Sequence, residues 1–521
     1  MKKILLLYIT SIIFVSSYAQ ITFSKSMGAG SNTADEFRHA SFTSDGGYVC
    51  TGDGASFSAK KSLVVKLDNA GTIQWSKNFG STQIDVPDHI HPVSTGGYIL
   101  AGEAYNSGTG DSNPYMIRMD NAGNITWQKT ITGSADMWVH DVAETNGGFV
   151  FCGAHSSTGA PSALEGIILK TDTLGTILWT KRIGAFSYLD DLYCIKKTND
   201  NGFVVLGESS SCAAGGLTLF KIDSVGVYQW GRMLCSTTGF FFAGNYGGLQ
   251  CTSDNGFVYT GFYSSPGDAG PLLVKTDSLG MIEWSRTFTG GGVTNGVTIA
   301  PDGGYVIGGS GLFGTSLSKS FLIKTDTLGS IEWANSYGDS TVCNSVVATP
   351  DGGYIAVGKR QRVGTSWDAW VAKTDPFGNI SGCSTPIFPV VDTPSFSFYT
   401  SIGYGFLSPS FVSANLIFTN TSVTPIQKIY CAAVTTGEIE FENNFEKNSA
   451  VFPNPTNGEF VIRSEENILS IEVSNLLGQL IYSSEINALD AKIDIINQTT
   501  GIYFVKIKTE SGFSIKKIIK E

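Results

Sequence analysis

The sequence is poor in charge. Only 15% of its 521 residues are Asp, Glu, Lys or Arg, and no cluster of Lys or Arg stands out. Acidic residues outnumber basic ones 45 to 34, and loss of the two lysines near the N-terminus with a leader gives a net charge of about −13 (32 − 45). Nucleic-acid binding depends on Lys and Arg that neutralise phosphates. The composition therefore argues against nucleic acid as a partner.

Long hydrophobic runs are also scarce. After residue 20 no segment offers the roughly 20 consecutive apolar residues of a membrane-spanning helix. The N-terminus has two lysines, an apolar run over 4–15 and small residues before Ala19, which is the layout of a secretory signal peptide. We expect residues 1–19 to be the leader, with cleavage between Ala19 and Gln20. The mature chain is then predicted to lack a membrane-spanning segment and to be soluble or anchored by other means.

Closely spaced cysteine pairs are absent. There is no Cys-x-x-Cys, which excludes zinc-ribbon and thioredoxin-type sites. Export permits disulfides, and two interpretations stay open for Cys383 and Cys431, which bracket the segment after the last repeat: a disulfide, or two buried free thiols. Because the total of nine is odd, at least one thiol is free or pairs with another chain.

Familiar catalytic motifs are missing as well. The repeats contain no Gly-x-Ser-x-Gly, no His-Glu-x-x-His and no phosphate-binding P-loop. Loop carboxylates could still form the pair that a glycoside hydrolase needs, because spacing in the sequence does not fix their separation in space. The sequence thus gives no positive evidence of an enzyme and predicts no cofactor.

What the chain has in abundance is glycine, 62 residues, and a repeat. Seven times a Gly-containing turn precedes an aromatic residue, and after a variable stretch an apolar run ends in Asp-x-x-Gly. The turns begin at Asp45, Thr95, Asn146, Asp200, Asp254, Asp302 and Asp351, and the Asp-x-x-Gly phrases at Asp68, Asp120, Asp172, Asp223, Asp277, Asp326 and Asp375. A period of about 50 residues is within the range of propeller blades.

Each repeat divides into four short apolar runs. The Gly turn supplies the positive φ angles of a tight hairpin between the first two runs, and Asp-x-x-Gly makes a side-chain-capped turn between the last two. The sequence therefore predicts four antiparallel strands per repeat and an all-β fold, a seven-bladed β-propeller over residues 20–383.

The fourth run indicates how the ring closes. It carries a Trp seven residues after the Asp in six repeats, at Trp75, Trp127, Trp179, Trp230, Trp284 and Trp333. The seventh repeat has Gly382 in this slot, whereas residues 21–28 match 73–80 position by position and put Phe23 there. We predict that the N-terminal strand completes the last blade and removes an exposed sheet edge. At one fixed register in every blade, the Trp side chains are expected to pack between sheets rather than to bind carbohydrate.

The Asp-x-x-Gly-x-x-x-Trp phrase resembles the repeat of quinoprotein-type propellers, whose blades are built around a similar Trp. The resemblance spans about eight residues per blade. Nothing in the chain matches the quinone-binding or calcium-binding residues of those dehydrogenases, so their activity is not carried over.

Strand order divides the connections between two faces of the ring. The turns between strands one and two and between strands three and four are short and uniform, whereas the remaining connections are long and dissimilar. A rigid scaffold that presents variable loops on one face is a common way to build a binding surface. We expect ligands on this variable-loop face.

Two sets of polar residues form the candidate binding site. We expect three His at one height on adjacent inner strands, and four Asp where the chain enters strand one on the variable-loop face. The residues are His39, His89, His140, Asp35, Asp85, Asp136 and Asp190. A ring of Asp could hold Ca²⁺ or bind sugar hydroxyls, and His is a metal ligand. The alternative is that the first four repeats are more recent copies of one another, whose His and Asp fill polar spaces between sheets.

The repeat ends before residue 384. Residues 384–448 are rich in Ser, Thr, Phe and Pro and predict an extended linker or a β-rich extension. In residues 449–521, Pro-Asn-Pro and Asn-Gly turns separate runs in which Ile, Val, Tyr and Phe alternate with polar residues. This pattern predicts a small C-terminal β-sandwich.

Residues 449–521 also resemble, over their whole length, the C-terminal sorting domain of the type IX secretion system of Bacteroidota. The resemblance rests on a Pro-Asn-Pro-x-x-Gly opening, a Leu-x-Gly-Gln turn, a Gly-Ile-Tyr strand and a basic end, carried by Pro453, Asn454, Pro455, Gly458, Gly478 and Gly501. It implies handling by the type IX secretion machinery, removal of the domain, and a product that is secreted or attached to the outer surface. The alternative is an unrelated Ig-like adhesive domain.

These observations predict a secreted or cell-surface β-propeller that binds a glycan or a surface protein. Two other functions stay open. One is an extracellular polysaccharide hydrolase or lyase that uses loop carboxylates, and the other is a structural component that only displays other parts.

Overall fold

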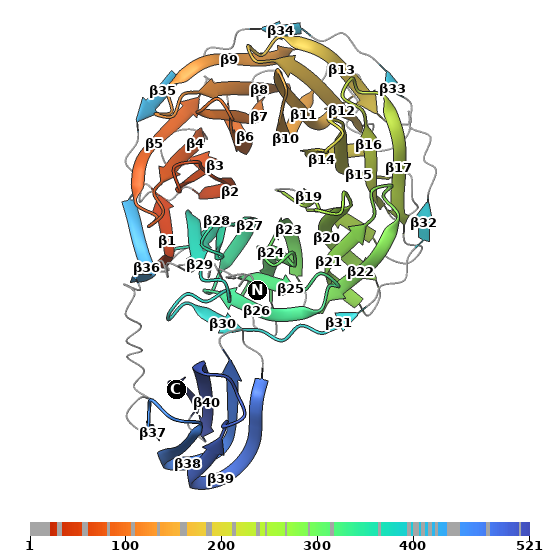
Figure 1. Ribbon diagram of the computed structural model, residues 1–521. Helices are drawn as coiled ribbons and strands as arrows, with labels where there is room; N and C mark the ends of the chain where they lie inside the picture. The colour runs from red at the N-terminus through yellow and green to blue at the C-terminus, as the bar shows by residue number, and fades with distance from the viewer. Residues whose placement is uncertain are drawn as a thin grey trace, which may run out of the picture. The chain divides into compact units, whose positions relative to one another are not determined.

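The computed structural model describes residues 21–521 with gaps, and every regular element of the described part is a β-strand (Figure 1). The gaps are 29–33, 55–60, 81–83, 106–109, 133–135, 157–163, 184–189, 211–214, 236–239, 245–246, 266–267, 290–291, 313–316, 363–365, 393–396, 400–405, 408–411, 415–418, 423–425, 435–448, 476–479 and 510–511. The leader and its cleavage site lie outside the described residues, and so does most of the variable-loop face. The chain divides into two compact units, Met1–Thr435 and Thr436–Glu521.

The described residues of the first unit form seven sheets, which we number in chain order. Sheets 1 to 4 each pair four antiparallel strands in sequence. They are β2 (Asp35–Phe42), β3 (Tyr48–Gly54), β4 (Ser62–Leu67) and β5 (Ile73–Gly80); β6 (Ile84–Pro92), β7 (Tyr98–Tyr105), β8 (Ser112–Met119) and β9 (Ile125–Thr132); β10 (Met137–Thr145), β11 (Gly148–Ser156), β12 (Leu164–Asp172) and β13 (Ile177–Ile183); and β14 (Asp190–Lys197), β15 (Phe203–Ser209), β16 (Gly216–Ile222) and β17 (Tyr228–Cys235).

Sheets 5 to 7 vary this plan. In sheet 5 the first strand is split into two pieces, and in sheet 7 the fourth strand comes from the N-terminus. The strands are β18 (Phe240–Ala243), β19 (Leu249–Cys251), β20 (Phe257–Ser265), β21 (Asp268–Thr276) and β22 (Ile282–Phe288); β23 (Gly292–Ile299), β24 (Tyr305–Gly311), β25 (Lys319–Thr325) and β26 (Ile331–Tyr337); and β27 (Thr341–Ala348), β28 (Tyr354–Gln361), β29 (Trp367–Thr374) and β1 (Ile21–Gly28). Figure 1 shows the sheets following one another around a propeller-like ring, with first strands inside and fourth strands outside.

Strand β1 takes the place that a fourth strand takes in the other sheets. It pairs antiparallel with β29, where Phe23 lies opposite Lys373. In sheet 1 the corresponding residue, Trp75, also lies opposite a lysine, Lys66. The two ends of the repeat region therefore share one sheet, in the register that the sequence comparison predicts.

The fourth-strand aromatic ring packs against the next sheet. Trp75 lies against Gly123 of the following Asp-x-x-Gly turn, and its Nε1 donates to the carbonyl of Asn121 at 3.1 Å. Phe23 lies in the same way against Gly71 of sheet 1. A glycine is required there because its φ is positive, +69° at Gly71, and because a Cβ would enter the ring. The repeated Trp residues are thus part of the packing between sheets.

The described strands of residues 384–434 add one outer strand to each of the seven sheets. We call this segment the belt. Its strands pair with the outer strands β26, β22, β17, β13, β9, β5 and β1 in that order, so it runs around the ring opposite to the repeats (Figure 1). They are β30 (Ser384–Pro386), β31 (Val391–Asp392), β32 (Ser397–Tyr399), β33 (Phe406–Leu407), β34 (Val412–Ala414), β35 (Thr419–Ser422) and β36 (Ile426–Val434). Of the two predictions for 384–448, the β-rich extension describes the belt; residues 435–448 lie outside the described part.

The second unit is one five-stranded, barrel-like sheet. Its long central strand pairs with the following strand along both of its halves, and a register shift between Arg463 and Ile468 separates the two halves, which share one core. The strands are β37 (Ser449–Phe452), β38 (Glu459–Asn475), β39 (Leu480–Asp494), β40 (Gly501–Thr509) and β41 (Gly512–Lys520).

Cysteine use is mixed. Cys235 and Cys383 each take part in a disulfide, and five of the described cysteines are free: Cys50, Cys152, Cys194, Cys251 and Cys343. The expected partner of Cys383, Cys431, lies in β36, where its side chain is outside the described part. Among the described residues, no helix is long and apolar enough to cross a membrane.

Candidate functional site

The first strand of six sheets carries a one-residue bulge. A bulge leaves one residue unpaired and re-aims its side chain. Every bulge side chain contacts a neighbouring sheet. The bulge residues are Arg38, Asp88, His140, Tyr193, Asn295 and Asn344.

Charged side chains at and beside these bulges form a continuous chain across sheets 7, 1, 2, 3 and 4. We call it the charged arc: Lys359, Glu36, Arg38, Asp88, His140 and Asp191. Lys359 Nζ lies 2.6 Å from Glu36, Arg38 lies 2.8 Å from Asp88, and His140 lies 3.2 Å from both Asp88 and Asp191. Each cation of the arc is thus paired with a carboxylate.

The arc is only partly buried. The side chains of Arg38, His140 and Asp191 remain 19%, 20% and 19% exposed. Burial lowers the pKa of His140, but Asp191 and Asp88 raise it well above its ordinary value, which favours the protonated imidazole. A ligand can therefore reach fixed donors and acceptors of both signs.

Neutral bonds continue the arc through the remaining bulges. Asn295 Nδ2 donates to the carbonyl of Cys343 at 3.0 Å, and Asn344 Nδ2 donates to the carbonyl of Phe37 at 2.8 Å. The second bond joins sheet 7 to sheet 1, residues 307 positions apart. The bulges thus connect sheet 6 to sheet 7 and sheet 7 to sheet 1 by hydrogen bonds at the level of the charged arc.

The structure does not place the three predicted His at one height. In sheets 1 and 2 the first hairpin encloses five residues, 43–47 and 93–97, whereas in sheet 3 it encloses only 146–147. The shorter turn shifts strand β10 by one residue. His140 therefore occupies the bulge, and Asp141 occupies the position of His39 and His89.

His39 and His89 belong to a second, more deeply buried cluster. Their ring centroids are 3.7 Å apart, and His89 Nε2 lies 2.9 Å from Asp141, which also pairs with Lys196 at 2.9 Å. Burial, together with the charge of His89, lowers the pKa of His39 well below its ordinary value. The cluster fits the polar filling between sheets that the sequence left open as an alternative.

Two of the four predicted Asp residues have partners at separate sheet interfaces. Asp85 pairs with Lys61 at 3.3 Å, and Asp136 accepts the backbone N–H of Ser112 at 2.7 Å, where the third strand of the preceding sheet begins. In sheet 7 the hydroxyl of Thr341 accepts the N–H of Ser320 in the same way. The residue that enters the first strand therefore needs only a hydrogen-bond acceptor, which a threonine provides as well as an aspartate. Asp35 and Asp190 are buried at the starts of β2 and β14.

Within the part of the chain that the structure describes, no three His, Cys, Asp or Glu side chains are grouped as metal ligands.

The second strands carry further carboxylates near the variable-loop side. Asp53, Glu103 and Glu208 stand five residues after the aromatic that opens each strand. Burial, with the charge of Asp88, raises the pKa of Glu103 to about 7; burial also raises the pKa of Glu208 to about 7. Burial likewise raises the pKa of Asp53, and Glu208 still accepts the N–H of Ala243 at 2.5 Å.

At the same level, sheet 5 carries three phenylalanines instead of charges. We call Phe240, Phe242 and Phe262 the aromatic patch. Their ring centroids are 5.3 to 6.3 Å apart, and Phe240 and Phe242 are 42% and 51% exposed. The intervening Phe241 is buried against Tyr263. The aromatic patch and five of the six arc residues, all except His140, were not among the predicted site residues, although the Phe-Phe-Phe run over 240–242 could have indicated the patch.

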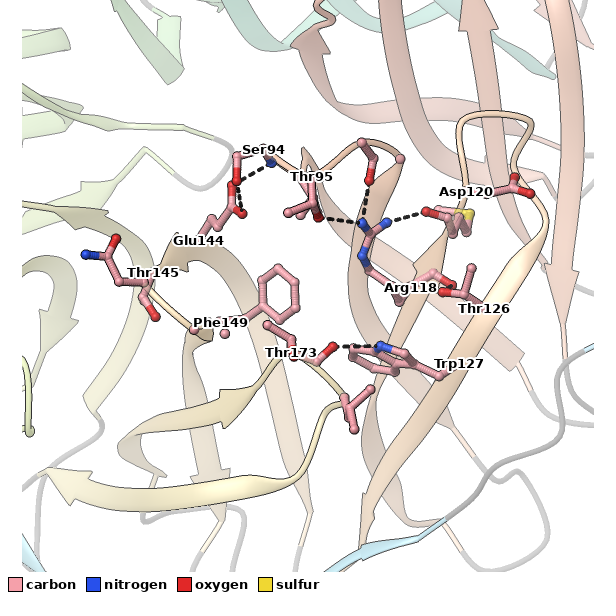
Figure 2. Close-up of a pocket in the computed structure, with 18 of the residues that line it drawn as sticks. Ser94, Thr95, Arg118, Asp120, Thr126, Trp127, Glu144, Thr145, Phe149 and Thr173 are labelled. Carbon is pink, nitrogen blue, oxygen red and sulfur yellow. Dashed lines mark hydrogen bonds between the residues drawn. The ribbon is translucent and has the colours of Figure 1, made fainter.

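A further pocket lies between sheets 2 and 3, beside the short hairpin turns on the face opposite the variable loops. It has a volume of about 920 Å³, and Figure 2 shows Arg118, Trp127 and Phe149 around it. Glu144 accepts from the N–H and Oγ of Ser94, and Arg118 donates to backbone carbonyls. Similar pockets of about 460 and 430 Å³ lie between sheets 4 and 5 and between sheets 6 and 7. The pocket is therefore a consequence of the repeated packing.

In the second unit, the predicted sorting motif ties the opening of the domain to its last strand. Asn454 Nδ2 donates to the carbonyl of Lys517 at 2.7 Å, and its Oδ1 accepts the N–H of Ile519 at 2.9 Å. Pro453 and Pro455 flank it, Gly458 has a φ of +121° beside Ile496, and Gly501 begins β40. Gly478 lies outside the described residues.

Comparison with known proteins identifies the second unit. A family described as the secretion system C-terminal sorting domain matches residues 450–521. The match indicates export through a type IX secretion system, to the cell surface or beyond. No curated protein matches the chain.

Two solved structures align with nearly the whole chain. One is PorZ of Porphyromonas gingivalis, described as an essential bacterial surface component of the type-IX secretion system; it is 8% identical over 96% of this chain and 100% of its own, with a TM-score of 0.17. The other is the extracellular domain of the putative one component system BT4673 from B. thetaiotaomicron, 8% identical over 97% and 98%, with a TM-score of 0.23. At these TM-scores neither alignment bears on function.

Proposed function

We propose that the chain is a closed seven-bladed β-propeller that is exported with the help of its C-terminal sorting domain and binds a glycan. The seven sheets, and the pairing of β1 with β29, support the closed ring. After removal of residues 449–521, the product stays at the outer surface or is released.

The observation that carries glycan binding is the charged arc. Its cations and carboxylates pair with one another, so the arc offers little net field to a strongly charged ligand. It offers instead planar donors and acceptors, held in place by pairing and partly exposed. Charge-assisted hydrogen bonds from such groups are stronger than neutral ones, and a polyhydroxylated ligand can donate and accept along the arc. Neither Ca²⁺ nor another metal is needed for this mode of binding.

The test is a glycan array probed with the purified full chain. We expect at least one glycan to bind, and Arg38→Ala to weaken binding because Arg38 joins Glu36, Asp53 and Asp88. The matched control is Arg463→Ala in the second unit, whose Arg pairs with Asp490 on an exposed surface. Release of new reducing ends from a bound polysaccharide would instead identify a hydrolase, and binding to no glycan would contradict the proposal.

A further inference from the structure

The split first strand of sheet 5 creates an exposed apolar surface beside the charged arc. Phe241 points into the core, so its neighbours Phe240 and Phe242 point to the opposite side of β18. Phe262 of β20 lies directly opposite Phe242 and completes the aromatic patch. Val293 of the next sheet is also largely exposed.

The position of the patch is unusual within the repeat. At the same register, sheets 1 and 4 carry the pairs Glu36–Asp53 and Asp191–Glu208. Aromatic side chains that served packing alone would be buried, as Phe241 is, because burial of a large apolar side chain is worth roughly 1.5–3 kcal/mol. Exposed contiguous apolar surface with a polar rim marks an interaction site.

The polar rim of the patch is acidic. Glu208 accepts the N–H of Ala243, the residue after Phe242, and Asp191 lies opposite Glu208 in the sheet register. A pyranose ring has one or two faces of C–H groups and a rim of hydroxyls, so it can stack on an aromatic ring while the hydroxyls donate to carboxylates. Both carboxylates already have one partner, because Asp191 pairs with His140 and Glu208 accepts the N–H of Ala243. A purely apolar protein side chain would still remove their remaining acceptor sites from water, which is costly. A sugar that bears a carboxylate would add a further negative charge beside them, which is unfavourable.

We propose that the aromatic patch is the stacking platform of the glycan site and that Asp191 and Glu208 beside it select uncharged sugars. This inference rests on the proposed glycan binding. The ligand class is a neutral polysaccharide, with one sugar ring on Phe242 and its hydroxyls on the two carboxylates.

The experiment is affinity electrophoresis of the full chain in gels that contain a neutral polymer, either mixed-linkage β-glucan or galactomannan, or a uronate polymer, either polygalacturonate or alginate. We expect retardation by a neutral polymer, none by the uronate polymers, and a roughly tenfold weaker affinity for Phe242→Ala. Phe240→Ala is the second variant, in case the first fails to fold. Leu279→Ala is the matched control, because Leu279 is as exposed but lies in an Asp-x-x-Gly turn.

The outcomes separate the two proposals. If no polymer retards the wild-type chain, the proposed glycan binding itself is wrong. If a neutral polymer retards the wild type and both folded Phe variants equally, glycan binding stands and the aromatic platform is wrong. Retardation by the uronate polymers overturns the selection by Asp191 and Glu208.

Discussion

Replacement of Phe23 by Ala tests whether the N-terminal strand holds the ring together. Phe23 is 1% exposed, packs in the core between sheets 7 and 1, and lies against Gly71. Lys25 Nζ lies 4.8 Å from the centre of its ring and donates to the carbonyl of Gly71 at 2.9 Å. The substitution removes the phenyl ring and leaves a cavity that the surrounding sheets cannot easily fill.

The expected cost is about 4 kcal/mol, within the range for buried Phe→Ala changes. The unit that unfolds has roughly 400 residues, and at about 2.1 cal/mol/K per residue its unfolding entropy is about 0.85 kcal/mol/K. The melting temperature should therefore fall by about 5 °C. Phe23→Trp restores the residue that the other six sheets carry and should stay within about 2 °C of the wild type.

Differential scanning calorimetry of the full chain measures these shifts. Phe377→Ala is the matched control, because Phe377 belongs to the same sheet region but is 68% exposed, and we expect a shift below about 1 °C. Equal melting temperatures for Phe23→Ala and Phe377→Ala would refute the role of β1 in closing the ring.

Three further predictions concern the packing, the charges and the export of the chain. Gly71→Ala should lower the free energy of unfolding by about 2–4 kcal/mol, because it combines a positive φ with a clash against Phe23. Gly382→Ala is the control and should lower it by only about 1 kcal/mol, because Gly382 has a φ of +72° but open space around it. Equal losses in thermal unfolding would contradict the packing of Phe23 on Gly71. The raised pKa of His140 adds stability that is complete below the unfolded-state pKa of about 6.5 and is lost as pH rises through the folded-state pKa. In denaturant titrations, the difference in unfolding free energy between wild type and His140→Gln should therefore shrink from pH 6 to pH 9. A constant difference would contradict the pairing of His140 with Asp88 and Asp191. Residues 449–521 fused to a periplasmic reporter should direct the reporter out of a cell that has a type IX secretion system. Asn454→Ala should reduce this export, because the two hydrogen bonds of Asn454 to the last strand are lost. Undiminished export of the variant would exclude a role of these bonds in sorting.

The fold was predictable where the sequence repeats itself. Asp-x-x-Gly and the Gly turn fix hairpins by local backbone chemistry, so strand number and pairing follow without long-range information. The match of 21–28 to 73–80 also predicted the register of Phe23 opposite Lys373. A repeated pattern carries such information because each copy confirms the others.

The site was harder to predict, since it depends on departures from the repeat. Counting back from the Gly turn placed His140 with His39 and His89, but the shorter hairpin of sheet 3 moved it by one residue into the bulge. The bulge itself leaves no mark in the sequence, so Arg38 and Asp88 stood unnoticed beside the His residues. Within the predicted Asp set, Asp136 accepts a backbone N–H of the preceding sheet, a role that Thr341 also fills, and Asp85 pairs with Lys61.

The belt shows a further limit of local patterns. Most of its strands have only two to four residues, too few for an alternation of apolar and polar positions to be detected. Their positions are set by the partners, because every sheet of the ring presents one outer strand whose backbone groups need pairing. The pairing of β1 with β29 does not remove this need, since β1 is itself the outer strand of sheet 7 until β36 pairs with it from Ile21 to Gly28. The segment that follows the last repeat thus completes the strand that precedes the first, and the ring and the belt depend on the same strand.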